Sequence, residues 1–188
     1  RDVNRWAQSR LCVIGTAKSG LSALLVAWAA ERKGAFLDGA AGAGKLFTAA
    51  EFGDGESVAI DNVDQIEDEN WLLTILSAAR RHQGYVLLAA HRPPSGCAVQ
   101  SPDLRSRLLA TQLVELGQPD DALMRARLKR ATARFGLSLP GAVEDYLVVR
   151  LGLSYTAIED TVNSLAGAAG GRRGLTVPLA RAALESTS

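Results

Sequence analysis

The feature that most constrains this 188-residue chain lies near its start, where an apolar run, a glycine-bounded loop and a helix-like run follow one another. The apolar run is Leu11–Ile14, the glycines are Gly15 and Gly20, and the helix-like run extends over 21–32. This order of strand, loop and helix is that of a phosphate-binding loop, whose pattern is G-x-x-x-x-G-K-[ST]. The outline therefore predicts a nucleotide-binding type of fold.

The loop departs from this pattern at the position that should carry charge. Leu21 stands where the pattern has lysine, while Ser22 keeps the hydroxyl position. A lysine ammonium there would reach the β- and γ-phosphates, whereas Leu21 offers neither a charge nor a hydrogen-bond donor. We therefore interpret the loop as a vestigial nucleotide site that has lost much of its chemistry. Its candidate residues are Gly15, Thr16, Ala17, Lys18, Ser19, Gly20, Leu21 and Ser22.

Composition limits the classes of function. The chain has 21 basic and 20 acidic residues, so its net charge of +1 gives no global electrostatic case for binding nucleic acid. The two cysteines, Cys12 and Cys97, lie far apart and are expected to be unpaired thiols in a reducing, cytoplasmic setting. No apolar run approaches the ~18 residues that a membrane span needs. The chain opens on Arg1 rather than methionine, so we allow for a missing N-terminal peptide.

The pattern changes character near residue 117. Before it, apolar strand-like runs alternate with helical patterns, which is typical of a parallel α/β sheet. The expected strands are Leu11–Ile14, Ala35–Leu37, Ser57–Ile60, Tyr85–Ala90 and Gln112–Leu116, with helices over 20–32, 68–82 and 102–109. Four further helices are expected to start near 120, 141, 154 and 175. The prediction is a five-stranded parallel sheet in 1–117, followed by a small all-α domain in 118–188.

Polar residues follow two of the expected strands. Asp61 comes directly after Ser57–Ile60, where a phosphate-binding-loop protein places the carboxylate that holds magnesium. Asn62 takes the next position, where a second carboxylate would often polarise water, and an amide cannot act as a base. Asp61 is thus a metal ligand only if magnesium binds; otherwise it is a strand end with a helix cap. His91 follows Tyr85–Ala90 as either a γ-phosphate sensor or a plain loop histidine.

A second stretch competes for the role of phosphate-binding loop. Gly39–Lys45 matches G-x-x-x-x-G-K by letter and follows Ala35–Leu37. Leu46 replaces the magnesium-binding hydroxyl, however, and the helical stretch over 46–52 makes only about two turns. We therefore favour the loop at 15–22 and keep this one as an alternative.

Two groups of basic residues could reach a partner. Arg105 and Arg107 are two residues apart and so lie on different helical faces. One could pair with Asp103 or Glu115, while the other points outward as an arginine finger for a neighbour's phosphates. A helix after 120 has a basic face, for which we favour simple solvation over DNA contact. Its cations are Arg125, Arg127, Lys129, Arg130 and Arg134, interleaved with Leu123, Leu128 and Ala131.

These pieces, in this order, resemble the AAA+ family of DnaA and its shortened relative Hda, particularly the alphaproteobacterial Hda-type proteins. The resemblance covers nearly the whole chain, and its most specific parts are Pro93–Pro94, Pro102–Leu108, Gln118–Asp121 and Leu175–Arg181. It implies that Arg107 is the arginine finger, Asp61 the Walker B acid and 15–22 the phosphate-binding loop. It also implies that the C-terminal helices form the lid of an AAA+ module.

The departures from that family are systematic. Leu21 replaces its lysine, Lys18 stands where glycine is usual, and Asn62 replaces the second acid. Leu153 occupies the place of the arginine that the lid directs at the nucleotide. Because charge is missing from both loop and lid, we expect an abandoned nucleotide site with no cofactor.

The resemblance then implies a degenerate AAA+ module that regulates initiation of chromosome replication through protein contacts. Its expected partners are DnaA or another AAA+ replication protein, and the polymerase sliding clamp through an N-terminal peptide that is not visible. Such a module could present Arg107 to ATP held by the partner and stimulate its hydrolysis. Two alternatives stay open. One is an ATP- or ADP-binding ATPase with magnesium, in which Lys18 substitutes for the missing lysine. The other is a helicase-loader-like adaptor using the basic helix, although direct DNA binding is not expected.

Overall fold

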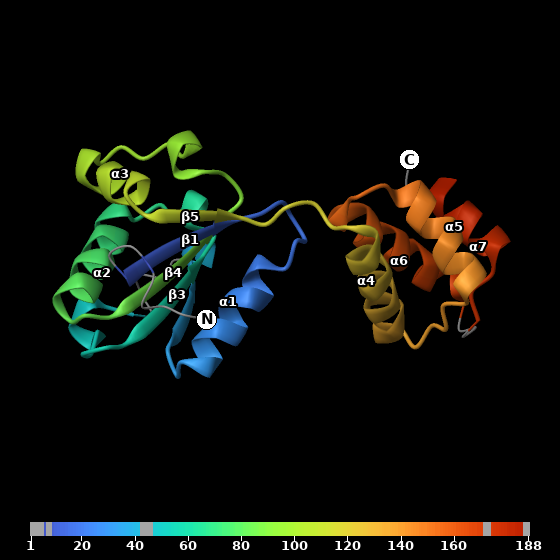
Figure 1. The fold of residues 1–188 in the computed structure, drawn as a ribbon, viewed down its shortest axis with the longest axis horizontal. Coiled ribbons are helices and arrows are strands. Elements are labelled where there is room, and N and C mark those ends of the chain that lie inside the picture. Colours follow the sequence, from blue (N-terminus) through green and yellow to red (C-terminus); the bar gives the residue numbers. More distant parts are fainter. Residues whose placement is uncertain (1–5, 7–8, 42–46, 171–173, 186–188) are drawn as a thin grey trace. The chain divides into compact units, whose positions relative to one another are not determined.

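The computed structural model describes residues 6, 9–41, 47–170 and 174–185. The chain forms two compact units, each with its own core (Figure 1). The sheet unit comprises residues 1–16 and 20–116, and the helical unit comprises 117–188 together with 17–19. The described helices include none that is long and apolar enough to cross a membrane.

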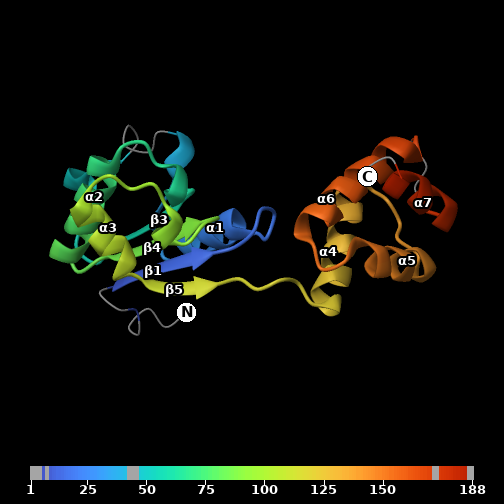
Figure 2. The same ribbon diagram turned by 90° about the horizontal axis from the view of Figure 1, so that it is seen from above.

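The sheet unit is built on five parallel strands in the order β2-β3-β4-β1-β5. Their bounds are Arg10–Ile14 (β1), Ala35–Asp38 (β2), Ser57–Asp61 (β3), Tyr85–Ala90 (β4) and Gln112–Glu115 (β5). Cys12 is opposite Leu88 of β4 on one side and Leu113 of β5 on the other. Figure 2 shows β5 beside β1. The predicted five-stranded parallel sheet is confirmed, and β4 separates β1 from β3 within it.

Alternating side chains divide the sheet unit into two cores, because successive residues of a strand point to opposite faces. One face packs against α2 (Glu69–Arg81) and α3 (Pro102–Leu109), and the other packs against α1 (Leu21–Glu31) (Figure 1). The α2 side receives Cys12, Ile14, Val58, Ile60, Val86 and Leu88. The α1 side receives Val13, Ala59, Leu87 and Ala89. The alanines among these leave room for α1 to pack closely on the sheet.

The helical unit consists of α4 (Asp121–Arg134), α5 (Gly141–Leu151), α6 (Tyr155–Ala169) and α7 (Val177–Glu185). Side-chain caps begin two of them: Asp120 accepts the N–H of Leu123 at 2.8 Å, and Ser154 accepts that of Ala157 at 3.2 Å. The expectation that Leu123 lies on the apolar face of α4 is wrong, because Leu123 is 41% exposed. The inward stripe of α4 runs instead through Met124, Leu128 and Ala131, whose spacing of four and three residues keeps them on one face.

The competing loop does not lead into a helix of the length expected. Residues 42–46 lie outside the described residues, and only a single 3₁₀ turn, Ala49–Glu51, follows before β3. Gly39, the first glycine of that match, is buried, and a Cβ there would lie 2.9 Å from the Asp61 carbonyl oxygen. This glycine therefore allows β2 to pass close to the end of β3.

Candidate functional site

The predicted phosphate-binding loop follows β1, and its start and end have a defined backbone. The Gly15 N–H donates to the Ala90 carbonyl at 3.3 Å, which ties the start of the loop to β4. Lys18 and Gly20 have left-handed backbone, with φ of 64° and 99°. The helix α1 then begins, and the N–H groups of its first turn have no partner within the helix. The backbone thus offers donors of the kind that bind anions.

The side chain at the lysine position faces the core. Leu21 is 3% exposed and packs in the cluster between α1 and the sheet, with neighbours such as Val13, Leu25 and Ala59. An ammonium group placed there would lose its hydration without gaining a partner, which is costly. Ser22 is exposed, so the hydroxyl position remains available. The cation that remains in the loop is Lys18, whose side chain is also exposed.

Within the helical unit, Arg127 of α4 binds the loop segment 17–19. Its guanidinium donates to the carbonyl oxygen of Lys18 at 2.7 Å and to that of Ser19. The same group stacks on the Tyr155 ring, with 4.5 Å between the guanidinium carbon and the ring centroid. Sequence reasoning placed Arg127 on a solvated basic face. The structure gives it a defined contact that the residue pattern did not indicate.

Asp61 and Asn62 lie at the end of β3 but do not form an acidic pair. Asp61 is 4% exposed, and its Oδ1 accepts the N–H of Asn62 at 2.9 Å. Asn62 has φ of 51° and donates from Nδ2 to Asp38 Oδ1 at 2.8 Å. The amide at the position of the second acid therefore joins the ends of β2 and β3. Across the described residues, no group of three or more His, Cys, Asp or Glu side chains could hold a metal ion.

His91 links β4 to the loop, and a buried carboxylate holds the segment in place. His91 Nδ1 lies 2.9 Å from the Gly15 carbonyl oxygen, and since a carbonyl only accepts, Nδ1 carries the proton. Asp64 accepts the N–H of His91 at 3.3 Å and Nε of Arg92 at 3.4 Å, with a side chain 2% exposed. Sequence reasoning assigned Asp64 no role. Its only signal was its place in the acidic run after β3.

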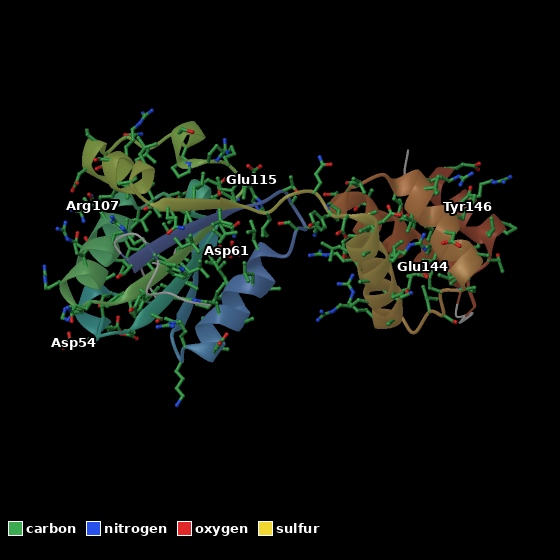
Figure 3. The ribbon with its side chains drawn as sticks, in the orientation of Figure 1. Asp54, Asp61, Arg107, Glu115, Glu144 and Tyr146 are labelled. Carbon is green, nitrogen blue, oxygen red and sulfur yellow. The ribbon has the colours of Figure 1, made fainter. Side chains whose placement is uncertain are left out.

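The structure thus brings part of the predicted site together. Gly15 and His91 directly follow β1 and β4, and Asp61 is the last residue of β3. These strands are neighbours in the sheet, so all three residues lie at its carboxyl edge. Arg107 is not among them. It sits in the last turn of α3, which leads into the start of β5, and so belongs to the opposite, amino edge. Figure 3 labels Asp61 and Arg107 at separate places in the sheet unit.

Of Arg105 and Arg107, Arg107 is the one whose guanidinium forms hydrogen bonds within the sheet unit. Its Nε and Nη2 donate to the two oxygens of Asp103 at 3.1 and 3.2 Å, and its Nη1 donates to Ser77 Oγ of α2 at 2.7 Å. Its side chain is 28% exposed. Arg105 is exposed, and its side chain has no ion-pair or hydrogen-bond partner among the described residues. Of the two acids considered from sequence, the partner of Arg107 is Asp103 rather than Glu115.

The basic face of α4 is largely neutralised within the helical unit. Lys129 lies 3.2 Å from Glu144 and Arg134 pairs with Glu159. Arg125 pairs with Asp145 at 2.6 Å, and this hydrogen bond raises the pKa of its guanidinium. Of the five cations expected on this face, Arg130 is the one without a partner in the described part of the chain. Three of the five cations are therefore paired with acids of the same unit, which reduces the positive charge available to a nucleic-acid backbone.

No known protein-family profile matches the chain. Domain III of the Thermotoga maritima replication initiation protein DnaA is similar in structure, with a TM-score of 0.76 at 13% identity, over 99% of this chain and 86% of that one. A replication initiator DnaA bound to AMPPCP and single-stranded DNA gives a TM-score of 0.70 at 17% identity, over 97% and 61%. The Thermotoga maritima RuvB Holliday junction branch migration motor gives 0.67 at 16% identity, over 95% and 61%.

The chain therefore covers most of DnaA domain III but less than two thirds of the longer DnaA and RuvB chains. At these identities the similarity concerns the fold. The five-stranded parallel sheet and the helical unit that follows it thus have a DnaA-like AAA+ fold.

Proposed function

We propose that this chain is a DnaA-related, Hda-like regulator of the initiation of chromosome replication, which acts by protein contact as a degenerate AAA+ module. The observation that carries the proposal is the contrast between two positions. Leu21, where the triphosphate-binding lysine belongs, is packed into the core, whereas Arg107 is retained and held in place. Arg107 also lies at the edge of the sheet opposite its own loop. An arginine so placed is suited to ATP held by another molecule.

In this proposal residues 1–117 form the AAA+ core and 118–188 its lid. The partner is DnaA or another AAA+ replication protein with bound ATP, and the sliding clamp is a second partner through an N-terminal peptide. A cytoplasmic location follows from such a role. One structurally similar DnaA binds single-stranded DNA. The internal pairing of the α4 cations supports protein contact over DNA contact for this chain.

The decisive test removes the proposed finger. We expect Arg107→Ala to abolish stimulation of ATP hydrolysis by an ATP-loaded DnaA, since an arginine finger contributes roughly 10³–10⁵-fold to such reactions. The measurement is phosphate release from DnaA at increasing concentrations of the purified protein. Arg105→Ala is the matched control, because it removes an exposed arginine from the same helix, and it should stimulate like the parent. Equal stimulation by the Arg107→Ala protein would refute the role.

The residues present do not fit a magnesium–nucleoside triphosphate. The loop retains backbone donors and the Ser22 hydroxyl, but Leu21 places no charge near a phosphate and Asn62 provides no second acid. We therefore propose that the protein works without a nucleotide cofactor. The alternative, ATP or ADP held with magnesium by Lys18 and Asp61, is favoured by the exposed Lys18 side chain and by the AMPPCP bound in a similar DnaA structure.

Calorimetry distinguishes a protein without a nucleotide cofactor from one that binds ATP or ADP. Titration of ATP and magnesium into the purified protein should give no binding with a dissociation constant in the micromolar range, since the charge that holds the triphosphate is absent. The Lys18→Ala protein should give the same flat titration. Micromolar affinity that disappears in Lys18→Ala would instead establish the nucleotide-binding alternative.

A further inference from the structure

The guanidinium of Arg107 is fixed in one orientation by two different helices. Asp103, one turn earlier in α3, accepts from Nε and Nη2. Ser77, on α2, accepts from Nη1 at 2.7 Å. A guanidinium has five N–H groups in a rigid plane, so three are engaged and two remain for a further acceptor. Because Asp103 and Ser77 accept from different nitrogens, rotation of the guanidinium would break at least one of these hydrogen bonds.

Ser77 is itself oriented. Its hydroxyl donates to the carbonyl oxygen of Leu73, one turn earlier in α2, at 2.7 Å. Since a hydroxyl has a single hydrogen, this bond turns the oxygen lone pairs toward Arg107. Ser77 therefore acts as an acceptor of fixed direction rather than as a freely rotating group.

A second arginine, Arg10, lies within electrostatic reach of Arg107. Arg10 is 5% exposed, and its pKa is lowered by burial and then by the nearby charges of Arg107 and Arg80. Repulsion between like charges disfavours positions of the Arg107 side chain nearer to Arg10. Asp103 and Ser77 hold this side chain in place, and Asp103 also balances the charge.

We propose that Ser77 is a positioning residue, which with Asp103 presents the two remaining N–H groups of Arg107 to a phosphate of the nucleotide bound by the partner. This inference rests on the proposed function. Its physical basis is preorganisation: a finger that is already oriented loses little freedom when it meets the phosphate, and displacements of about 1 Å can cost up to 10²-fold in rate. Neither residue needs to touch the nucleotide.

The test compares hydroxyls on one helix. Ser77→Ala should lower the maximal rate of stimulated ATP hydrolysis about tenfold and leave the concentration for half-maximal stimulation unchanged, because the docking surface is intact. Ser77→Thr, which keeps the hydroxyl, should restore the rate. Thr74→Ala is the matched control, because Thr74 also donates to the carbonyl four residues earlier but has no hydrogen bond to an arginine in the described part of the chain. It should behave like the parent.

A second variant tests Asp103, the other residue that accepts hydrogen bonds from Arg107. Asp103→Asn keeps one acceptor oxygen but loses the charge and one bond to Arg107, so the maximal rate should again fall. If Arg107→Ala leaves stimulation unchanged, both the proposed function and this inference are overturned. If Arg107→Ala abolishes stimulation while Ser77→Ala matches Thr74→Ala, only the inference is overturned.

Discussion

At the scale of single residues, Leu21 at the start of α1 stands where the phosphate-binding pattern has lysine. A lysine in that position would direct its ammonium at a bound phosphate, whereas Leu21 contributes to the core between α1 and the sheet. Leucine at this position therefore lacks the charge and also contributes to packing. Introducing lysine would place an ammonium group in the core.

This predicts the effect of restoring lysine. Leu21→Lys should lower the free energy of unfolding by about 3 kcal/mol, since a buried leucine is lost and an ammonium must find water. Leu24→Lys, a matched change at a position 42% exposed on the same helix, should cost no more than about 0.5 kcal/mol. Urea titration measures both. An unchanged midpoint for Leu21→Lys, together with new micromolar ATP binding, would show that position 21 faces the loop.

At the scale of elements, α4 shows why a row of cations is a weak sign of DNA binding. Its inward stripe is apolar, and its outer cations meet acids of α5 and α6. The arrangement centres on Glu144, whose side chain is 7% exposed and lies near Lys129 and Arg125. Its Oε1 makes ion pairs without a hydrogen bond of good geometry, so the neighbouring charges are its main compensation. The outer cations are much better solvated than this carboxylate.

Because Glu144 is buried and its cations are solvated, removal of a cation should lower the free energy of unfolding more than removal of the carboxylate charge. Lys129→Met should lower the free energy of unfolding by about 2 kcal/mol, because it leaves a buried carboxylate with only Arg125, 3.6 Å away. Glu144→Gln should cost about 1 kcal/mol or less, since the cations left behind can be hydrated. Arg130→Met, on the same helix, should be nearly neutral. Thermal or urea unfolding of the three variants ranks them, and a larger loss for Glu144→Gln than for Lys129→Met would contradict this account.

At the scale of the whole molecule, the elements were largely predictable and their spatial relations were not. Strands such as Tyr85–Ala90 and helices such as Pro102–Leu109 have clear local signals: apolar runs, a serine cap and proline in the first turn. The order of the strands has no such signal. It places His91 against Gly15 and separates both from Arg107, and these relations underlie the proposed mode of action.

The sequence by itself determined the α/β-then-helical organisation and the leucine at the lysine position of the phosphate-binding pattern, because these depend on residue type and local periodicity. Only the tertiary structure decided that Leu21 faces the core, that Asn62 bridges two strand ends and that Ser77 holds Arg107. The physical reason is the separation along the sequence over which each kind of interaction acts. Propensity and capping act within a few residues, whereas burial and side-chain hydrogen bonds join residues about 20 to 30 positions apart, which come together only when the sheet and its covering helices assemble.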